Sequence, residues 1–152
     1  MKTIVAALDF SDVTEEVLNH AVCMATAFEA DLHLVHTIDP GPNYAMYGFA
    51  PADFPHYSMN VRLRSASNSR LQELATGTGL PEGKVHTATL IAMAVSGILQ
   101  YAEDVKADLL VAGAHGHGVL GAVLLGSVAQ GLVRRAELPT LIVPVGKSSI
   151  SR

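Results

Sequence analysis

The stretch Leu109-Leu110-Val111-Ala112-Gly113 is the clearest structural signal in the sequence. Its four consecutive apolar residues are too few for a helix, and a glycine ends them. Such a run is typical of a strand that is buried on both faces of a parallel sheet. A second run, Ile4-Val5-Ala6-Ala7-Leu8, ends at Asp9. We therefore expect these two strands at the centre of a sheet that helices cover on both sides.

The rest of the sequence alternates between helical and strand-like spacing of apolar residues. Helices are predicted over about 13–29, 58–76, 95–105 and 128–136, and further strands over 31–38, 85–90 and 141–143. The 85–90 strand carries His86, Thr87 and Thr89, which favours the edge of the sheet. This order predicts one α/β domain over residues 1–152, with a doubly wound, five-stranded, mainly parallel sheet of the Rossmann-like type.

Two packing details follow from the same patterns. Leu63, Leu71 and Leu74 are expected to face inward from the 58–76 helix. Cys23 is the only cysteine, so an internal disulfide cannot form, and its apolar neighbours favour a buried thiol.

Composition argues against several classes of protein. The chain has 152 residues, of which 49% are hydrophobic and 16% charged, and this argues against disorder. A formal net charge of -4 without a basic stripe argues against nucleic-acid binding. The stretch from Leu109 to Val133 lacks charged residues, but its glycines indicate a turn and a buried helix, not a membrane span. We expect a cytoplasmic protein without membrane insertion.

Candidate ligand-binding residues follow the two most apolar strands. Ligands of open parallel sheets bind beyond the carboxyl ends of the strands, where the strand order reverses. Asp9 follows the first strand, and Gly113 ends the strand that begins at Leu109. A carboxylate beside a glycine turn suits a ligand that has both hydroxyls and phosphates. The alternative is that Asp9 only caps the first helix.

The segment from Gly113 to Val128 was compared with three phosphate-binding patterns. It has no lysine, so it is not a Walker A loop. Residues 116–121 match GxGxxG, but no acidic residue for a ribose ends the one strand that follows. The third pattern is Gly113, two residues, Gly116, nine residues, and then Gly126-Ser127. Its glycines would let backbone amides approach phosphate, and the start of the last helix would attract an anion. The alternative is that the glycines only serve tight turns.

This third pattern resembles the signature of the nucleotide-binding subgroup of the universal stress protein family. The resemblance covers most of the chain and extends to four further segments: Ile4–Ser11, Leu34–Pro40, Asp108–Gly113 and Leu138–Pro144. It implies an adenine nucleotide alpha hydrolase-like fold. It also implies a bound adenine nucleotide (ATP, ADP or AMP, with or without magnesium) and a homodimer joined through Leu141–Val145.

The resemblance also implies a set of binding residues. Asp9 and the backbone of Thr37 would hold adenine or ribose. Ribose and phosphates would be held by Gly113, His115, Gly116, Gly126, Ser127 and Val128.

The sequence departs from the family pattern in three places, one of which is Ala92-Met93-Ala94, where the family often has Gly-x-Pro before the third helix. Where many family members carry a basic residue after the glycines, this chain has none, so phosphate binding would rely on backbone amides, the helix dipole and a cation. His115 and His117 form an HxH pair, which is too few ligands for a zinc site, and we assign no metal site. The aromatic-rich segment Tyr44–Tyr57 has no family counterpart. It could be a lid, a docking surface for a protein partner, or a structural flap.

Three functions remain open at this point. The first is an adenine-nucleotide-binding regulatory module of the stress response. The second is a slow ATPase or nucleotidyl-transfer enzyme, although we assign no catalytic residue. The third is a dimeric interaction protein with a vestigial nucleotide site. Fold alone does not choose among them.

Overall fold

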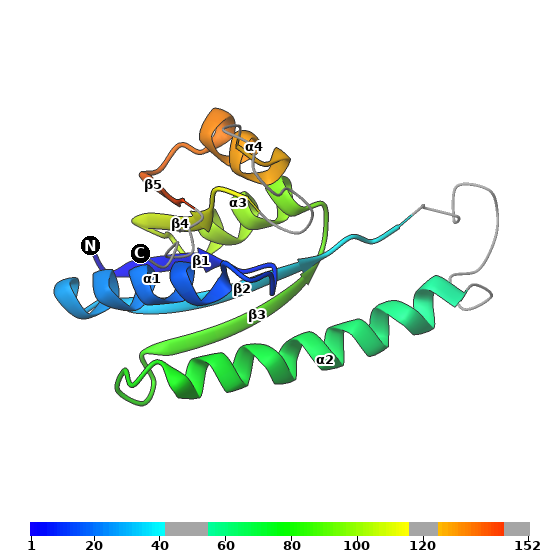
Figure 1. Cartoon of the computed structure of the whole chain (residues 1–152), viewed down its shortest axis with the longest axis horizontal. Coiled ribbons are helices and arrows are strands. Elements are labelled where there is room, and N and C mark those ends of the chain that lie inside the picture. The colour runs from blue at the N-terminus through cyan, green and yellow to red at the C-terminus, as the bar shows by residue number, and fades with distance from the viewer. Residues whose placement is uncertain (42–54, 116–124, 145–152) are drawn as a thin grey trace, which may run out of the picture.

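The computed structural model describes residues 1–41, 55–115 and 125–144 and, apart from 55–58, their side chains (Figure 1). The elements are, in order, β1 (Thr3–Ala7), α1 (Thr14–Phe28), β2 (Asp31–Ile38), α2 (Pro55–Gly77), β3 (Val85–Ile91), α3 (Ala94–Asp104), β4 (Leu109–Gly113), α4 (Ser127–Arg135) and β5 (Thr140–Val143). The predicted alternation of strands and helices is confirmed. The largest shift in a boundary is at α2, which begins three residues earlier than the expected Ser58.

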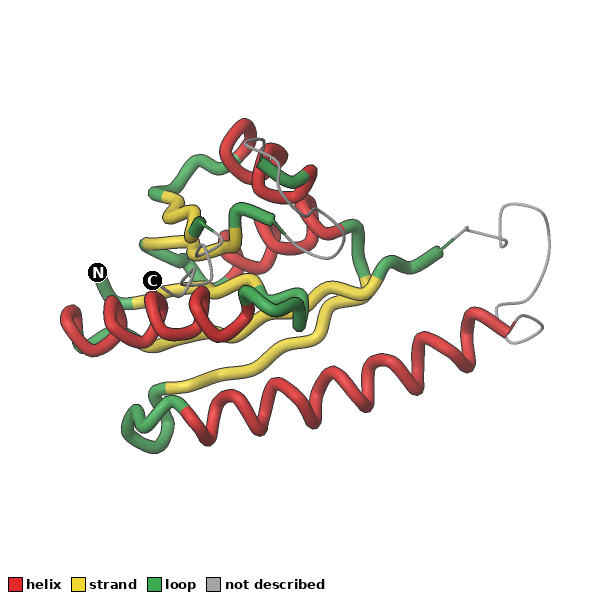
Figure 2. The backbone as a smooth tube through the Cα atoms, viewed as in Figure 1, coloured by secondary structure: helices red, strands yellow, loops and turns green. Residues whose placement is uncertain are grey.

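The strands form one parallel sheet in the order β3-β2-β1-β4-β5 (Figure 2). As the sequence predicts, β1 lies at the centre with β4 beside it, and β3 lies at an edge. The chain winds outward from β1 through β2 to β3, and then returns to the other side of β1 for β4 and β5. The strand order therefore reverses between β1 and β4.

Two helices cover each face of the sheet, as expected for a doubly wound fold. On one face, α1 and α2 bury a cluster that includes Ile4, Leu34 and Leu71. On the other, α3 and α4 bury a second cluster around Val35, Leu110 and Leu132. Adjacent residues of β1 and β4 alternate between the two clusters, which explains why these strands are apolar without interruption.

Side chains become smaller along the two central strands. The paired residues of β1 and β4 are, from the amino to the carboxyl end, Ile4 with Leu109, Val5 with Leu110, Ala6 with Val111, and Ala7 with Ala112. Large side chains fill the space between the helices at the amino end. Alanines leave more room at the carboxyl end.

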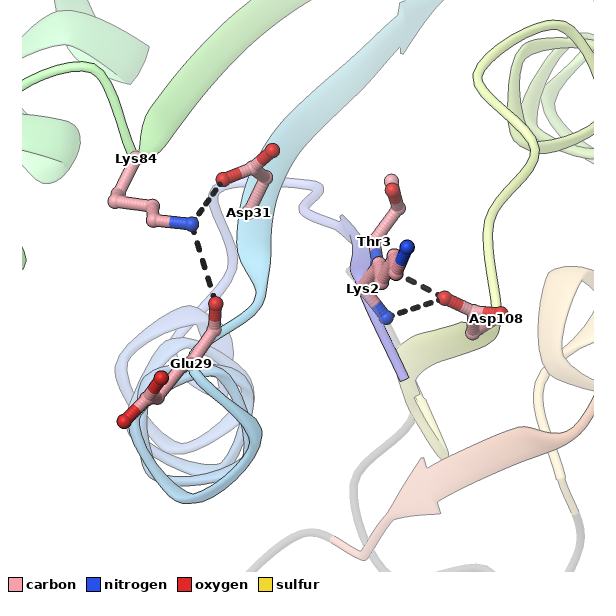
Figure 3. Close-up of polar contacts among 6 residues, drawn as sticks. All are labelled: Lys2, Thr3, Glu29, Asp31, Lys84 and Asp108. Carbon is pink, nitrogen blue, oxygen red and sulfur yellow. Dashed lines mark hydrogen bonds and ion pairs between the residues drawn. The ribbon is translucent and has the colours of Figure 1, made fainter.

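Polar groups at the amino end of the sheet bind one another (Figure 3). Lys84 Nζ lies 2.8 Å from Asp31 Oδ1 and donates to the carbonyl of Glu29 at 3.1 Å. The hydrogen bond from Lys84 to Asp31 and the charge of Lys84 hold the pKa of the Asp31 carboxyl below its usual value. Asp108 Oδ2 accepts hydrogen bonds from the backbone amides of Lys2 and Thr3, which lower the pKa of Asp108. The contacts of Lys84 join the starts of β2 and β3, and those of Asp108 join the starts of β1 and β4.

Two packing predictions were wrong. Leu63 is 45% exposed, because the first half of α2 extends beyond the sheet and the helix first buries side chains at Ser67 and Leu71. Cys23 is also exposed. The buried residues of α1 lie two positions before and after it, at Ala21 and Ala25, so the helical period turns Cys23 toward solvent. Leu71 and Leu74 do pack against the core.

The uncharged stretch from Leu109 to Val133 contains β4 and most of α4, with residues 116–124 outside the described part. Within the described ranges, no helix has the length and apolar character that a membrane span requires.

Candidate functional site

A cavity of about 270 Å³ lies at the carboxyl ends of β1 and β4, where the strand order reverses. The loops after these strands, β2, and the starts of α1, α3 and α4 contribute to its walls. Seven of the eight residues predicted from the sequence line it: Asp9, Thr37, Gly113, His115, Gly126, Ser127 and Val128. The eighth, Gly116, lies outside the described residues.

Asp9 shapes the turn that leaves β1. Its Oδ1 accepts hydrogen bonds from the backbone amide of Ser11 at 3.0 Å and from the Ser11 hydroxyl at 2.6 Å. Asp9 is not the N-cap residue of the first helix, because α1 begins at Thr14 and its N-cap is Val13. The carboxylate therefore lies at the rim of the cavity as part of a short turn.

Gly113 is closely packed at the end of β4. A Cβ atom at this position would lie 3.2 Å from the carbonyl oxygen of His115. It would also lie 3.3 Å from Val13 Cγ2 and 3.4 Å from Val17 Cγ2. The glycine thus lets the first turn of α1 approach the end of β4, and both elements line the cavity.

The start of α4 offers backbone amides to the cavity. Gly126 is its N-cap, and no side chain of the described residues caps the helix. The Gly126 amide donates to the carbonyl of Ala114 at 2.8 Å, which fixes the start of α4 beside the end of β4. The first amides of a helix have no acceptor within the helix, and the dipole is positive there, so this position suits an anion. Gly126 has φ −63° and ψ 161°, an extended conformation that any residue adopts, so this position does not need the backbone freedom of glycine.

His36 and Thr14 line the cavity, but the sequence analysis did not assign them to the site. His36 Nδ1 lies 2.7 Å from the carbonyl oxygen of Leu8, and its ring stacks on Phe10. The Thr14 hydroxyl is buried and has no hydrogen-bond partner among the described residues. The strand pairing of Ala7 with Val35 is the signal that would have placed His36 beside Leu8, and it requires the sheet order to be known.

The turn after β1 includes a strained residue. Phe10 has φ 61°, which is left-handed for a residue with a large side chain. This conformation costs about 1–2 kcal/mol and persists only where the surrounding contacts favour it. Here those contacts include the stacked ring of His36, whose centroid lies 4.3 Å from that of Phe10.

The other strand histidines lie away from the cavity. His33 Nδ1 lies 3.0 Å from the Tyr101 hydroxyl, and the His33 ring stacks on that of His86. Burial, with a smaller contribution from His86, lowers the pKa of His33. Burial also raises the pKa of Tyr101. In the described parts of the chain, no three His, Cys, Asp or Glu residues lie close enough to hold a metal ion, and His117 is not among these residues.

The described cavity residues combine polar groups with an apolar wall. They include one carboxylate, three hydroxyl groups, two histidines and the backbone at the start of α4, but no lysine or arginine. The remaining wall is apolar, with Val35 and Ile98 on the α3 side. A ligand with an apolar ring, hydroxyls and an anionic end matches these surfaces.

Comparison with known proteins gives a consistent result. Residues 1–144 match the model of a family described as the universal stress protein family. A universal stress protein of Thermus aquaticus is 34% identical over 142 residues, which cover 93% of this chain and 98% of that protein. A universal stress protein of Methanocaldococcus jannaschii is 31% identical over 142 residues, covering 93% of this chain and 81% of that protein.

Solved structures show the same fold. Protein MJ0577 of Methanocaldococcus jannaschii has a TM-score of 0.79 and 23% identity, covering 97% of this chain and 98% of its own. A universal stress protein solved in complex with cAMP has a TM-score of 0.62 and 28% identity, covering 93% of this chain and 95% of its own.

Proposed function

Because this chain belongs to the universal stress protein family, we propose that its cavity binds an adenine nucleotide, and that the protein is a nucleotide-dependent regulatory module of the stress response. The observation that carries the proposal is the convergence of seven predicted residues on one cavity at the reversal of the strand order. The relative solved with cAMP adds support. A universal stress protein of Archaeoglobus fulgidus, solved with dAMP, shares the fold at 20% identity.

The chemistry of the walls suggests how the nucleotide lies. Asp9 and the backbone of Thr37 would hold adenine or ribose. The phosphates would lie at the start of α4, where the amides of Ser127 and Val128 and the helix dipole favour an anion. Gly113 and His115 would line the space between, and Gly116 would complete the phosphate side. We propose ATP as the ligand, with ADP and AMP as alternatives.

The same walls argue for binding without rapid turnover. Phosphoryl transfer normally uses cationic side chains, a metal ion and a residue that positions the nucleophile. The described residues around the cavity supply no cationic clamp. Magnesium bound with the phosphates would provide positive charge, and hydrolysis would remain slow.

We also propose a homodimer joined through Leu141–Val145. Within the described sheet, β5 has β4 on one side and no strand on the other. Leu141 and Ile142 are only partly buried. A second copy of β5 would satisfy this open edge. Val145 and most of the proposed docking segment Tyr44–Tyr57 lie outside the described residues, and a protein partner there stays a prediction.

The test is calorimetric titration with ATP, ADP and AMP, with and without magnesium, on wild type, Gly126→Asp and Gly126→Asn. Both substitutions suit the extended backbone of Gly126 and an N-cap, so both variants should fold. The Asp carboxylate would repel phosphate, and we expect ATP affinity to fall by more than about 100-fold, whereas Asn of the same shape costs less.

The pair of variants separates charge from bulk. Equal losses in both variants would mean that space, not phosphate charge, controls this position. Wild type that has been freed of retained ligand and still binds none of the three nucleotides would disprove the nucleotide module. The dimeric interaction protein would then be the better account.

A further inference from the structure

His36 holds the turn that carries Asp9. The turn leaves β1 at Leu8, whose amide donates to the carbonyl of Val35 at 2.8 Å in continuation of the sheet. The Leu8 carbonyl oxygen lies 2.7 Å from Nδ1 of His36. Because a carbonyl only accepts, Nδ1 carries the proton. Both backbone polar groups of Leu8 are therefore bound to β2, one of them through the imidazole.

The same imidazole contacts the residue that follows Asp9. The rings of His36 and Phe10 stack with centroids 4.3 Å apart and planes at 30°. Phe10 has φ 61°, a conformation that needs support from its surroundings. His36 thus contacts the residue on each side of Asp9.

The position of the Asp9 carboxylate depends on this turn. Its Oδ1 is held by the amide and hydroxyl of Ser11, two residues along the same turn. If the backbone around Phe10 relaxed, Asp9 and Ser11 would move together, because the hydrogen bonds between them are local. His36 comes from a different strand and ties this local unit to the sheet.

We propose that His36 is a positioning residue for nucleotide binding, which holds the turn from Leu8 to Ser11 so that Asp9 faces the ligand. This inference rests on the proposed function. It gives His36 a role beyond that of a structural histidine with satisfied hydrogen bonds. The imidazole acts through Asp9 and needs no contact of its own with the nucleotide.

Three substitutions separate the two contacts of the ring. His36→Ala removes both, and we expect ATP affinity to fall about tenfold. His36→Asn keeps an N–H donor near the position of Nδ1 and should restore most of the affinity. His36→Phe keeps a stacking ring without the donor and should bind ATP with an intermediate affinity. The order wild type, Asn, Phe, Ala is the expected result.

A double-mutant cycle with Asp9→Ala tests whether His36 acts through Asp9. In the Asp9→Ala background, His36→Ala should change ATP affinity by less than about twofold, because the carboxylate it positions is gone. An equal tenfold loss in both backgrounds would overturn the proposal. His33→Ala is the matched control on the same strand. Neither His33 nor its hydrogen-bond partner Tyr101 lines the cavity. The ATP affinity of His33→Ala should therefore stay within about twofold of wild type.

Amide hydrogen exchange provides a measurement that needs no nucleotide. The Ser11 amide donates to Asp9, and its exchange should become faster in His36→Ala while the amides of α1 keep their rates. An unchanged exchange rate for the Ser11 amide would overturn the proposal even if the protein binds ATP.

If wild type binds no nucleotide, both the proposed function and the role of His36 in nucleotide binding fail. If it binds and all His36 variants bind equally, only the role of His36 fails.

Discussion

The two ends of the parallel sheet differ in how fully their own side chains fill them. At the amino end, Asp31 and Asp108 are bound by Lys84 and by backbone amides, and the central strands pair Ile4 with Leu109. At the carboxyl end the same strands pair Ala7 with Ala112, and a cavity replaces the filled core. The amino end is closed by its own contacts. The carboxyl end leaves room and backbone amides for a ligand.

This difference separates stability from binding along a single pair of strands. Large side chains at one end bury apolar surface and stabilise the fold. Small side chains and Gly113 at the other end reduce that burial and open the cavity. Substitutions that reduce side-chain size at the amino end should therefore affect folding, and substitutions that add size at the carboxyl end should affect the ligand.

The largest expected effect is at the amino end, on replacing Ile4, which is fully buried. Ile4→Ala would leave a cavity between the sheet and α1, and we expect it to lower the free energy of unfolding by about 2–5 kcal/mol. Ile4→Val should cost about 0.5–1.5 kcal/mol. Urea unfolding measures both. If Ile4→Ala lowered the free energy of unfolding by less than about 1 kcal/mol, the amino end would not be the better packed one.

The next effect is at the carboxyl end, on filling the cavity from Ala7. Ala7→Leu should lower ATP affinity at least about 30-fold, since the larger side chain extends into the proposed ligand site, and should change the free energy of unfolding by less than about 1.5 kcal/mol. Ala88→Leu is the control, because Ala88 packs on the same face but does not line the cavity. Calorimetric titration of ATP would contradict the prediction if both variants bound equally well.

Much of this contrast could be predicted from the sequence. The two uninterrupted apolar runs indicated the central strands, and the residues after them indicated the site, because the carboxyl ends of parallel strands meet at one edge. The small residues Ala7 and Ala112 were visible as well. Their pairing was not, because register depends on how the strands align in the folded sheet.

The parts that could not be predicted depend on contacts between distant elements. His36 reaches the site only because β2 lies beside β1, and the sequence shows it simply as a histidine in a strand. The Thr14 hydroxyl was missed for the same reason. Leu63 fits a helical stripe, but the sheet does not extend as far as the first half of α2, so the residue stays exposed.

A smaller effect is expected from Asp108→Asn at the amino end. The amides of Lys2 and Thr3 hold the pKa of Asp108 below its usual value of 3.8. The carboxylate therefore stabilises the folded state above about pH 4, and this contribution is lost as the pH falls through the lowered pKa. Asp108→Asn should be less stable than wild type at pH 7, and the difference should shrink toward pH 3. Urea unfolding at several pH values tests this, and a difference independent of pH would refute it.

The smallest effect concerns two hydroxyl groups on the edge strand β3. Thr89 is buried and its hydroxyl has no partner among the described residues, whereas the Thr87 hydroxyl accepts a hydrogen bond from Gln72 at 2.7 Å. Thr89→Val removes an unsatisfied polar group and should raise the free energy of unfolding by up to about 1 kcal/mol. Thr87→Val, two residues earlier on the same face, removes a satisfied group and should leave stability unchanged or slightly lower. If Thr89→Val proved the more destabilising of the two, the Thr89 hydroxyl would have a partner in solution. The Thr14 hydroxyl, at the cavity, would then be the one buried side-chain hydroxyl without a hydrogen bond among the described residues.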